Sequence, residues 1–259
     1  MDRASFFCAE EATYPRTWDT VDRANDVVVC VPHTPDPVLF GIRGESPAWV
    51  REARTYVVAE EPACEQVYAT NQGTDAHLAP GTVGELREGR SYLVRGTVAG
   101  PAVTGVGGHV SFPLVDEEGE VRCMAYEPTK GFRDVVRALV PGDGVAVAGS
   151  YKGGSLNLEK IGICRLADTV RIHPPLCPVC GRRMTSAGAG KGYKCRVCSE
   201  RSREPEVEQV ERRISPGWYE VPPTARRHLA RPLVRGVPAW EEAVLRSGGE
   251  CGREPGQVK

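Results

Sequence analysis

Alternating apolar and polar positions dominate the middle of the chain, from Ser91 to Arg165. Most of the five runs in this stretch alternate with a period of two, and glycine-rich connections separate them, which is the pattern of half-buried β-strands. The runs are SYLVRGTVAG, GHVSFPLVD, EVRCMAYE, GVAVAGS and SLNLEKIGIC.

A helix is predicted between the third and fourth runs. Apolar residues recur there at helical spacing, at Phe132, Val135, Val136 and Leu139. Thr129 is the expected N-cap, and Pro141 with Gly142 ends the helix. Five strands with a helix after the third predict an OB-fold barrel, a fold that binds single-stranded or looped nucleic acid.

The pattern before residue 80 is weaker and indicates only part of a domain. Short apolar runs predict strands over residues 26–31, 38–42 and 66–70. Ser46 followed by Pro47 predicts the start of a helix that ends near Tyr56. Residues 71–77, NQGTDAH, form a loop that suits either a binding site or a plain surface turn.

Two CxxC pairs, 14 residues apart, stand in CPVCGRRMTSAGAGKGYKCRVC. Each pair presents two thiolates to one point, and two pairs complete a tetrahedral zinc site. Four thiolates leave no position for water, so the expected zinc is structural. Structural disulfides are the other interpretation, although nothing else in the chain indicates secretion. The predicted ligands are Cys177, Cys180, Cys195 and Cys198.

Composition and charge change this picture in two ways. With 259 residues, 41% of them hydrophobic and 26% charged, the chain is globular in composition and long enough for two or three domains. We expect a cytoplasmic protein without a membrane partner, since no apolar run reaches the roughly 18 residues that a spanning helix needs. Charge is uneven: residues 1–90 carry 8 Lys+Arg against 15 Asp+Glu, and residues 171–235 carry 14 against 6.

The basic segment around the zinc motif indicates a phosphate-bearing partner, although a solvated basic face is the simpler interpretation. Predicted contacts on the barrel are Arg95, Arg122, Lys152 and Lys160, and Tyr126 is either a core residue or a stacking platform. The zinc hairpin adds Arg182, Arg183, Lys191, Tyr193, Lys194 and Arg196. The later ARRHLARPLVR is a predicted arm, with Arg226, Arg227 and Arg231 as contacts and His228 as a surface residue.

Several long strings resemble one family. They are HTPDPVLFGIRGESP, ATNQGTDAHL, AYEPTKGFRDVVRALVPGD, SLNLEKI, CPVCGRRMTSAGAGKGYKCRVC and ARRHLARPL, and the similarity runs from about residue 10 to about residue 235. They resemble the C-terminal portion of the archaeal tRNA-isoleucine 2-agmatinylcytidine synthetases, the TiaS family.

The resemblance implies a fold, a reaction and a set of partners. The implied multidomain fold, of α+β and β class, is a partial ferredoxin-like region over residues 1–80, an OB-fold over 81–170, a zinc ribbon over 171–204, a basic arm over 205–245 and a disordered tail over 246–259. The implied reaction uses ATP to activate carbon two of the wobble cytidine in a CAU anticodon, and agmatine then displaces the activated oxygen. The implied partners are tRNA and agmatine.

The family also has an N-terminal kinase-like domain that holds ATP, and this sequence begins inside the ferredoxin-like region. A split gene, a truncation and a misplaced start codon are the three explanations. We expect a separate kinase-like chain to supply ATP and Mg²⁺ chemistry, and this chain alone to be inactive.

Agmatine is a dication and needs carboxylates or carbonyls at both ends. Asp36 and Asp75 are the first candidates and Glu45 the next, although each also suits a loop carboxylate that caps backbone N–H groups. Other residues in the family-like loops are Arg43, Gly44, Asn71, Gln72, Gly73 and Thr74. The catalytic residues stay unknown. Two further hypotheses remain open, a general single-strand nucleic-acid binder and an inactive remnant.

Overall fold

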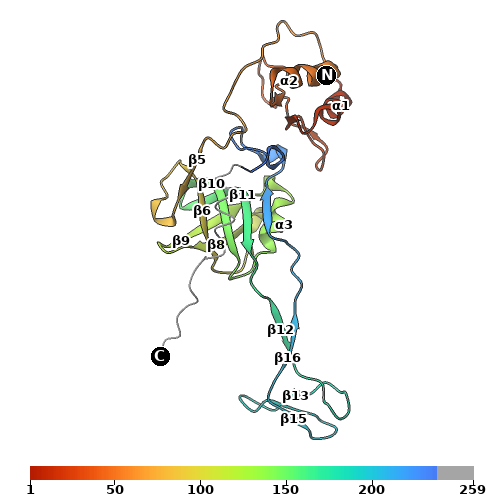
Figure 1. Ribbon diagram of the computed structural model, residues 1–259, viewed down its shortest axis with the longest axis vertical. Helices are drawn as coiled ribbons and strands as arrows, with labels where there is room; N and C mark the ends of the chain where they lie inside the picture. The colour runs from red at the N-terminus through yellow and green to blue at the C-terminus, as the bar shows by residue number, and fades with distance from the viewer. Residues whose placement is uncertain (238–259) are drawn as a thin grey trace. The chain divides into compact units, whose positions relative to one another are not determined.

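The computed structural model describes residues 1–237 in two compact units (Figure 1). One unit holds Met1–Leu166 and the chain from Pro216 onward, and the other holds Ala167–Ser215. The predicted tail over 246–259 and the end of the predicted arm lie outside the described residues. No helix in the described part is both long and apolar enough to span a membrane.

A closed five-stranded barrel is the centre of the first unit, and all five predicted strands are confirmed. Hydrogen bonds join them in the order β6, β10, β11, β9, β8, and a β6–β8 pairing closes the ring. β11 and β9 run parallel, whereas the other barrel pairs are antiparallel. The strands are β6 (Ser91–Val98), β8 (Val110–Val115), β9 (Glu120–Ala125), β10 (Gly144–Lys152) and β11 (Ser155–Arg165).

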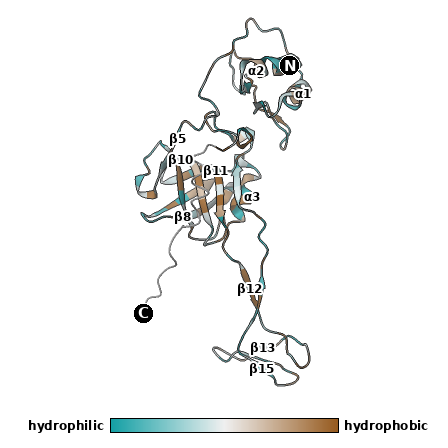
Figure 2. Ribbon diagram, viewed as in Figure 1, coloured by the Kyte–Doolittle hydropathy of each residue, from teal (hydrophilic) through white to brown (hydrophobic). Residues whose placement is uncertain are grey.

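The alternation in sequence becomes an inside and an outside of the barrel. Val110, Phe112 and Leu114 on β8 are buried, and the residues between them are only half-buried. Figure 2 shows hydrophobic residues along these strands. Gly149 lies at a register shift between β10 and β11, where an added Cβ would come within 2.1 Å of the Asn157 carbonyl oxygen. A glycine is therefore required at this bend.

Helix α3 (Phe132–Arg137) packs against β8 and β9, and its Phe132 and Val136 are buried. The expected cap at Thr129 is wrong, because Gly131 precedes the helix and makes no side-chain cap. Thr129 ends the 3-10 turn η3 (Glu127–Thr129), and its hydroxyl donates to the Tyr126 carbonyl at 2.7 Å. A positive φ of 47° at Lys130 separates the two turns.

The first 60 residues form two helices over a small apolar cluster. Helix α2 (Pro47–Tyr56) confirms the prediction, with the Ser46 hydroxyl accepting a hydrogen bond from the Trp49 N–H. Helix α1 (Arg3–Thr13) is an element that the sequence pattern does not predict. Its Phe6 is packed with buried residues of later segments, among them Val21 and Cys30.

Two of the three strands predicted in this region are wrong. Residues 38–42 and 66–70 form no strand, and Tyr68 is 75% exposed. Phe40 and Ile42 pack on the apolar cluster as side chains and not through a β-ladder, which explains their apolar run. The 26–31 strand is reduced to a two-residue ladder. The short pairs are β1 (Thr17–Trp18) with β4 (Arg43–Gly44) and β2 (Val21–Asp22) with β3 (Val27–Val28).

Residues after Pro216 return to the barrel and add buried side chains to it, so the predicted basic arm over 205–245 is in part a structural element of this unit. β17 (Gly217–Glu220) pairs antiparallel with β11, and Val221 and Ala230 are buried. The remaining small elements of this unit are β5 (Leu78–Gly81), β7 (Val103–Thr104), η1 (Val83–Glu85), η2 (Val106–Gly108), η4 (Pro223–Ala225) and η5 (Leu233–Arg235).

The second unit is a two-stranded ladder followed by a small three-stranded sheet. The ladder pairs β12 (Val170–His173) with β16 (Glu206–Gln209). The sheet contains β13 (Thr185–Ser186), β14 (Tyr193–Lys194) and β15 (Arg201–Ser202). Only one small apolar cluster forms among its described residues, around Cys177, Met184 and Cys195.

Candidate functional site

The four cysteines of the CxxC pairs converge in the second unit. Their sulfur atoms all lie within 4.8 Å of one another. The Sγ–Sγ distance is 3.6 Å for Cys177–Cys198 and for Cys180–Cys195, and 3.7 Å for Cys195–Cys198. A tetrahedral zinc with Zn–S bonds of about 2.3 Å requires sulfur atoms about 3.8 Å apart. The cluster therefore fits a closed structural zinc site, as predicted.

Local electrostatics in the cluster favour a metal. Backbone N–H groups of Cys198 and Val197 lower the pKa of the Cys195 thiol to about 6. Hydrogen bonds from the Cys198 S–H to the Cys180 and Cys177 sulfurs raise the pKa of Cys198, because they stabilise its protonated form, and a second thiolate so close is unfavourable without a cation. A Zn²⁺ ion removes that conflict, because a coordinated thiol is deprotonated outright.

Basic side chains surround the zinc cluster, and most of them face solvent. Of the predicted phosphate contacts here, Arg182, Lys191, Lys194 and Arg196 make no ion pair with residues 1–237. Arg183 differs, because its guanidinium pairs with Glu206 at 2.9 Å. Tyr193 is half-buried and packs against the cysteine cluster, which gives its ring a structural role.

In the first unit, the structure brings the two family-like loops together. The Arg43 Nε donates to the Gln72 Oε1 at 2.7 Å, across 29 positions of sequence. Gly44, on the same short strand, has Val50 and Thr17 packed so closely that an added Cβ would lie 2.8 Å from Val50 Cγ1. The Thr74 hydroxyl donates to the Asn71 carbonyl at 2.6 Å and shapes the loop from within.

The predicted arm holds this polar loop in place. Gly73 N–H donates to the His228 carbonyl at 2.8 Å, and Asp75 N–H donates to the Leu229 carbonyl at 2.9 Å. Arg231 N–H donates in return to Asp75 Oδ1 at 2.8 Å. His228 Nδ1 lies 2.6 Å from the Arg43 Nη2, so the histidine belongs to this network. The segment therefore acts as a clasp on residues 71–77 in this structure.

Two buried cations of this unit, Lys160 and Arg226, form ion pairs. Lys160 Nζ contacts Asp75 Oδ2, with side chains 2% and 1% exposed. Arg226 contacts Asp19 and also pairs with Glu220 at 2.7 Å. Lys160, Arg226 and Asp75 are thus closed off from any ligand in solvent, although the sequence predicts two of them as tRNA contacts and the third as an agmatine contact.

Burial raises the pKa values of Asp19 and Glu220, and the nearby Arg226 guanidinium opposes this shift in both. Neither acid stands out in the sequence. The same is true of Glu159, which is 5% exposed and accepts from Arg227 Nη1 and pairs with His77 Nε2, each at 2.9 Å. All three acids stand in ordinary strand or turn contexts, so no local pattern marks them.

The other predicted carboxylates are accessible. Asp36 Oδ1 accepts from the Val38 N–H at 2.8 Å and the residue is exposed, which matches a loop cap. Glu45 lies 3.9 Å from Arg16 Nε, and 43% of its side chain is exposed. On the barrel, Arg122 and Lys152 are exposed and Arg95 is half-buried.

Comparison with known proteins identifies relatives for nearly the whole chain. Residues 1–77 match the TiaS FLD domain, and residues 174–214 match the TiaS C-terminal zinc ribbon domain. A tRNA-isoleucine 2-agmatinylcytidine synthetase, TiaS, of Methanosarcina mazei is 52% identical over 237 residues, which are 91% of this chain and 55% of the relative. The resemblance to the TiaS family is confirmed.

Solved TiaS structures share the fold of this chain. A complex of TiaS with an isoleucine tRNA and ATP has a TM-score of 0.85 at 46% identity and covers 92% of this chain and 56% of its own. A complex of TiaS with an isoleucine tRNA, AMPCPP and agmatine has a TM-score of 0.80 at 45% identity, with coverage of 90% and 55%. The chain therefore spans slightly more than half the length of the TiaS proteins it matches.

Proposed function

We propose that this chain is the tRNA-binding and agmatine-side part of a tRNA-isoleucine 2-agmatinylcytidine synthetase. The observation that carries the proposal is the similarity over nine-tenths of the chain to the Methanosarcina mazei enzyme and to TiaS complexes with tRNA, ATP and agmatine. The barrel and the zinc ribbon are the parts of the fold that support an RNA-binding role. A cytoplasmic location stays a prediction.

The ATP chemistry is assigned to a kinase-like domain, which we propose is supplied by a separate chain. The TiaS relatives are longer than this chain, which matches about 55% of the Methanosarcina mazei protein. When bound, ATP and Mg²⁺ would supply the activation of the cytidine oxygen. Residues 1–77, which match the TiaS FLD domain, would supply the ferredoxin-like part, with α1 and α2 packed on one another.

Accessible cations are the proposed RNA contacts. In the ribbon they are Arg182, Lys191, Lys194 and Arg196, and on the barrel they are exposed Arg122 and Lys152 with half-buried Arg95. Arg227 and Arg231 are further proposed RNA contacts, and each also makes a hydrogen bond within the fold, to Glu159 and to Asp75 respectively. Lys160 and Arg226 are left out, because their charges are neutralised in buried pairs that RNA does not reach.

Asp36 and Glu45 are the proposed agmatine contacts, since they are the accessible carboxylates in the family-like loops. Asp75 contributes indirectly by fixing the loop of residues 71–77 through Lys160 and Arg231. Asp36→Asn and Glu45→Gln should each raise the KM for agmatine and leave the affinity for tRNA unchanged. Glu61→Gln, an exposed acid outside these loops, is the control.

Reconstitution tests the proposed function. The chain is mixed with the kinase-like half of a TiaS relative, ATP, radiolabelled agmatine and a tRNA with a CAU anticodon. The tRNA is then digested, and its nucleosides are analysed by mass spectrometry. We expect 2-agmatinylcytidine only when both polypeptides are present. Binding of tRNA without any product, together with equal binding of unrelated single strands, would favour a general nucleic-acid binder.

A further inference from the structure

Residues 66–70, QVYAT, form an open backbone edge in this structure. They lie in the long connection that Figure 1 shows between helix α2 and strand β5. No backbone N–H or C=O group of residues 66–70 makes a backbone–backbone hydrogen bond with residues 1–237. The Val67 carbonyl accepts a long hydrogen bond from the Gln66 side chain, at 3.4 Å. The main chain of this segment therefore has donors and acceptors to offer to a partner.

The composition of the segment is that of a β-strand. Val67, Tyr68 and Thr70 are β-branched or aromatic, and these residue types are enriched in strands. Residues 63–71 are all exposed, with Val67 at 36% and Tyr68 at 75%. An exposed strand-forming segment without a partner strand is a template for pairing with another chain.

Both ends of the segment are held by the fold. At the first end, Glu65 Oε1 accepts from Arg54 Nε at 2.5 Å, and the Arg54 guanidinium lies over the Phe40 ring at 5.6 Å. At the other end, Gln72 Oε1 accepts from Arg43 Nε at 2.7 Å. A segment anchored at both ends loses less entropy on becoming a strand than a free tail does.

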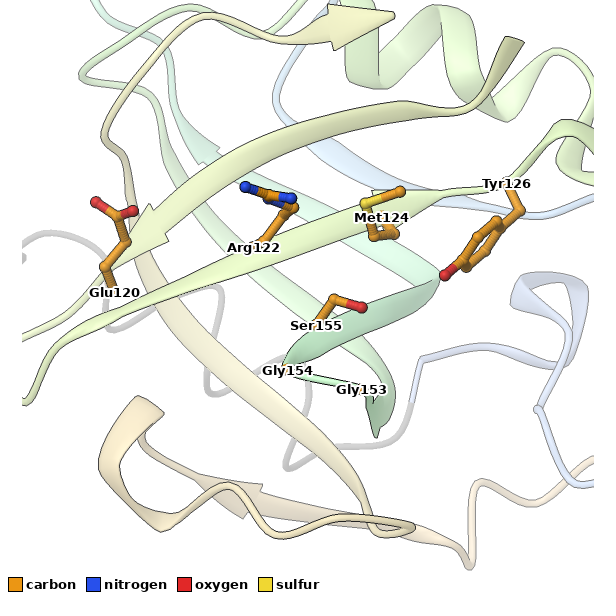
Figure 3. Close-up of a pocket in the computed structure, with 7 residues that line it drawn as sticks. All are labelled: Glu120, Arg122, Met124, Tyr126, Gly153, Gly154 and Ser155. Atoms are coloured by element: carbon orange, nitrogen blue, oxygen red, sulfur yellow. The ribbon is translucent and has the colours of Figure 1, made fainter. Parts of the chain in front are cut away.

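Charge indicates that the partner of this segment is a polypeptide and not RNA. Residues 55–86 contain no lysine or arginine, and residues 1–90 carry 8 Lys+Arg against 15 Asp+Glu. RNA binding depends on cations that neutralise phosphates. The proposed RNA contacts lie on other elements, and Figure 3 shows one of them, Arg122, on strand β9 of the barrel. The edge of a β-sheet, in contrast, needs only main-chain donors and acceptors.

The segment lies next to the proposed agmatine-side loops. Gln72 is two residues after Thr70, or about 7 Å along an extended chain. Gln72 contacts Arg43, which is two residues before the proposed agmatine contact Glu45. A polypeptide paired with residues 66–70 is therefore held beside these loops. The proposed function assigns the ATP chemistry to a separate chain, and that chain has to meet agmatine there.

We infer that residues 66–70 bind, as an added β-strand, to the open sheet edge of the polypeptide that carries the kinase-like domain. The inference rests on the proposed function for the identity of that polypeptide, and it adds the segment and the mode of contact. In strand addition, main-chain hydrogen bonds supply affinity and alternate side chains supply specificity.

Hydrogen exchange of the full chain, followed by mass spectrometry, tests the inference. The probe is the kinase-like half of the Methanosarcina mazei TiaS, shown to be folded by its binding of a fluorescent ATP analogue. In the chain alone, the amides of residues 66–70 should exchange as fast as those of an unstructured peptide. The probe should slow their exchange by about tenfold or more, and tRNA alone should leave it unchanged.

Proline substitutions test the strand itself. Successive N–H groups of a strand point to opposite edges, so only one of Val67 and Tyr68 donates to the partner. Proline is tolerated in an edge strand where its nitrogen faces solvent. One of Val67→Pro and Tyr68→Pro should therefore weaken probe binding about tenfold, relative to alanine at the same position, and the other should not.

These variants should fold as wild type, because neither N–H has a backbone partner among residues 1–237, and unchanged tryptophan fluorescence checks this. Ala63→Pro is the matched control, an exposed position in the same connection but outside the strand, and should bind the probe as wild type does.

Several results would overturn the inference: no complex with the folded probe, a complex without protection of residues 66–70, or equal effects of the two prolines. Protection by tRNA alone would assign the segment to RNA, and protection that rises with the concentration of the chain itself would assign it to a second copy. Formation of 2-agmatinylcytidine without this protection would refute the strand contact alone. Protection by the probe without any product would refute the proposed reaction alone.

Discussion

The buried pair of Lys160 and Asp75 offers the sharpest test of the structure. Both side chains are almost completely buried, at 2% and 1% exposure, and they join positions 85 residues apart. Removing one partner of a buried pair leaves an uncompensated charge, which costs about 3–5 kcal/mol. Lys160→Met should therefore lower the free energy of unfolding by about that amount, a large share of a typical total of about 5–15 kcal/mol.

The double variant separates pairing from packing. Asp75 has a φ of 61°, which asparagine tolerates, so Asp75→Asn changes the charge without straining the backbone. The Arg231 N–H can still donate to the asparagine oxygen. Lys160→Met combined with Asp75→Asn removes both charges of the pair, and nearby Glu220 keeps Arg226 as its ion partner, so we expect a loss of about 1–2 kcal/mol, less than that of Lys160→Met alone.

Urea unfolding followed by tryptophan fluorescence is the assay. All four tryptophans lie outside residues 167–215, and the three described ones, Trp18, Trp49 and Trp218, belong to the unit that contains the pair, so their signal reports on that unit. Lys191→Met, an exposed cation of the second unit, is the control and should leave the midpoint unchanged. A loss below about 1 kcal/mol in Lys160→Met, or additive effects in the double variant, would refute the buried pair.

Three further predictions follow from single residues. Cys195→Ser, or zinc chelation, should unfold residues 177–198 locally and weaken tRNA binding. The tryptophan fluorescence should stay unchanged. Full tRNA affinity in the variant would show that the ribbon is not needed for tRNA binding. Burial raises the pKa of Glu10, so its charge opposes folding above that pKa and not below its ordinary value of 4.5. Glu10→Gln should therefore be more stable than wild type at pH 7, and this gain in stability should shrink as the pH falls toward about 4. Calorimetry at both pH values measures the difference, and a variant that is less stable than wild type at pH 7 would contradict the reasoning. Burial raises the pKa of Cys30 to about 12, so this thiol should react with a disulfide reagent far more slowly than exposed Cys64, and equal labelling rates would contradict its burial.

Local sequence correctly predicted the features that depend only on residues close together in the chain. The CxxC spacing predicts a zinc site because each knuckle brings its own two sulfurs together. Alternation predicts the barrel strands because one face of each strand must be buried. Ser46 before Pro47 predicts helix α2 because the cap bond spans only three residues.

Short apolar runs gave wrong strand predictions where no partner strand pairs with them. Residues 38–42 are apolar because Phe40 and Ile42 pack on the cluster around Phe6, and that packing needs no β-ladder. Residues 217–220 carry no clear strand pattern, because their place is set by β11, more than 50 positions earlier in the chain. Strand pairing of this kind is a tertiary choice that local propensity does not contain.

The tertiary structure alone decided the roles of the charged side chains. In sequence, Lys160 and Arg226 are basic residues like Lys191 or Arg182, and all four are expected to meet phosphate. Folding buries the first pair against Asp75 and Asp19 and leaves the second pair in solvent. The reason is physical: a charge is defined by the sequence, but whether it binds a ligand or stabilises the fold depends on which distant carboxylate the chain brings beside it.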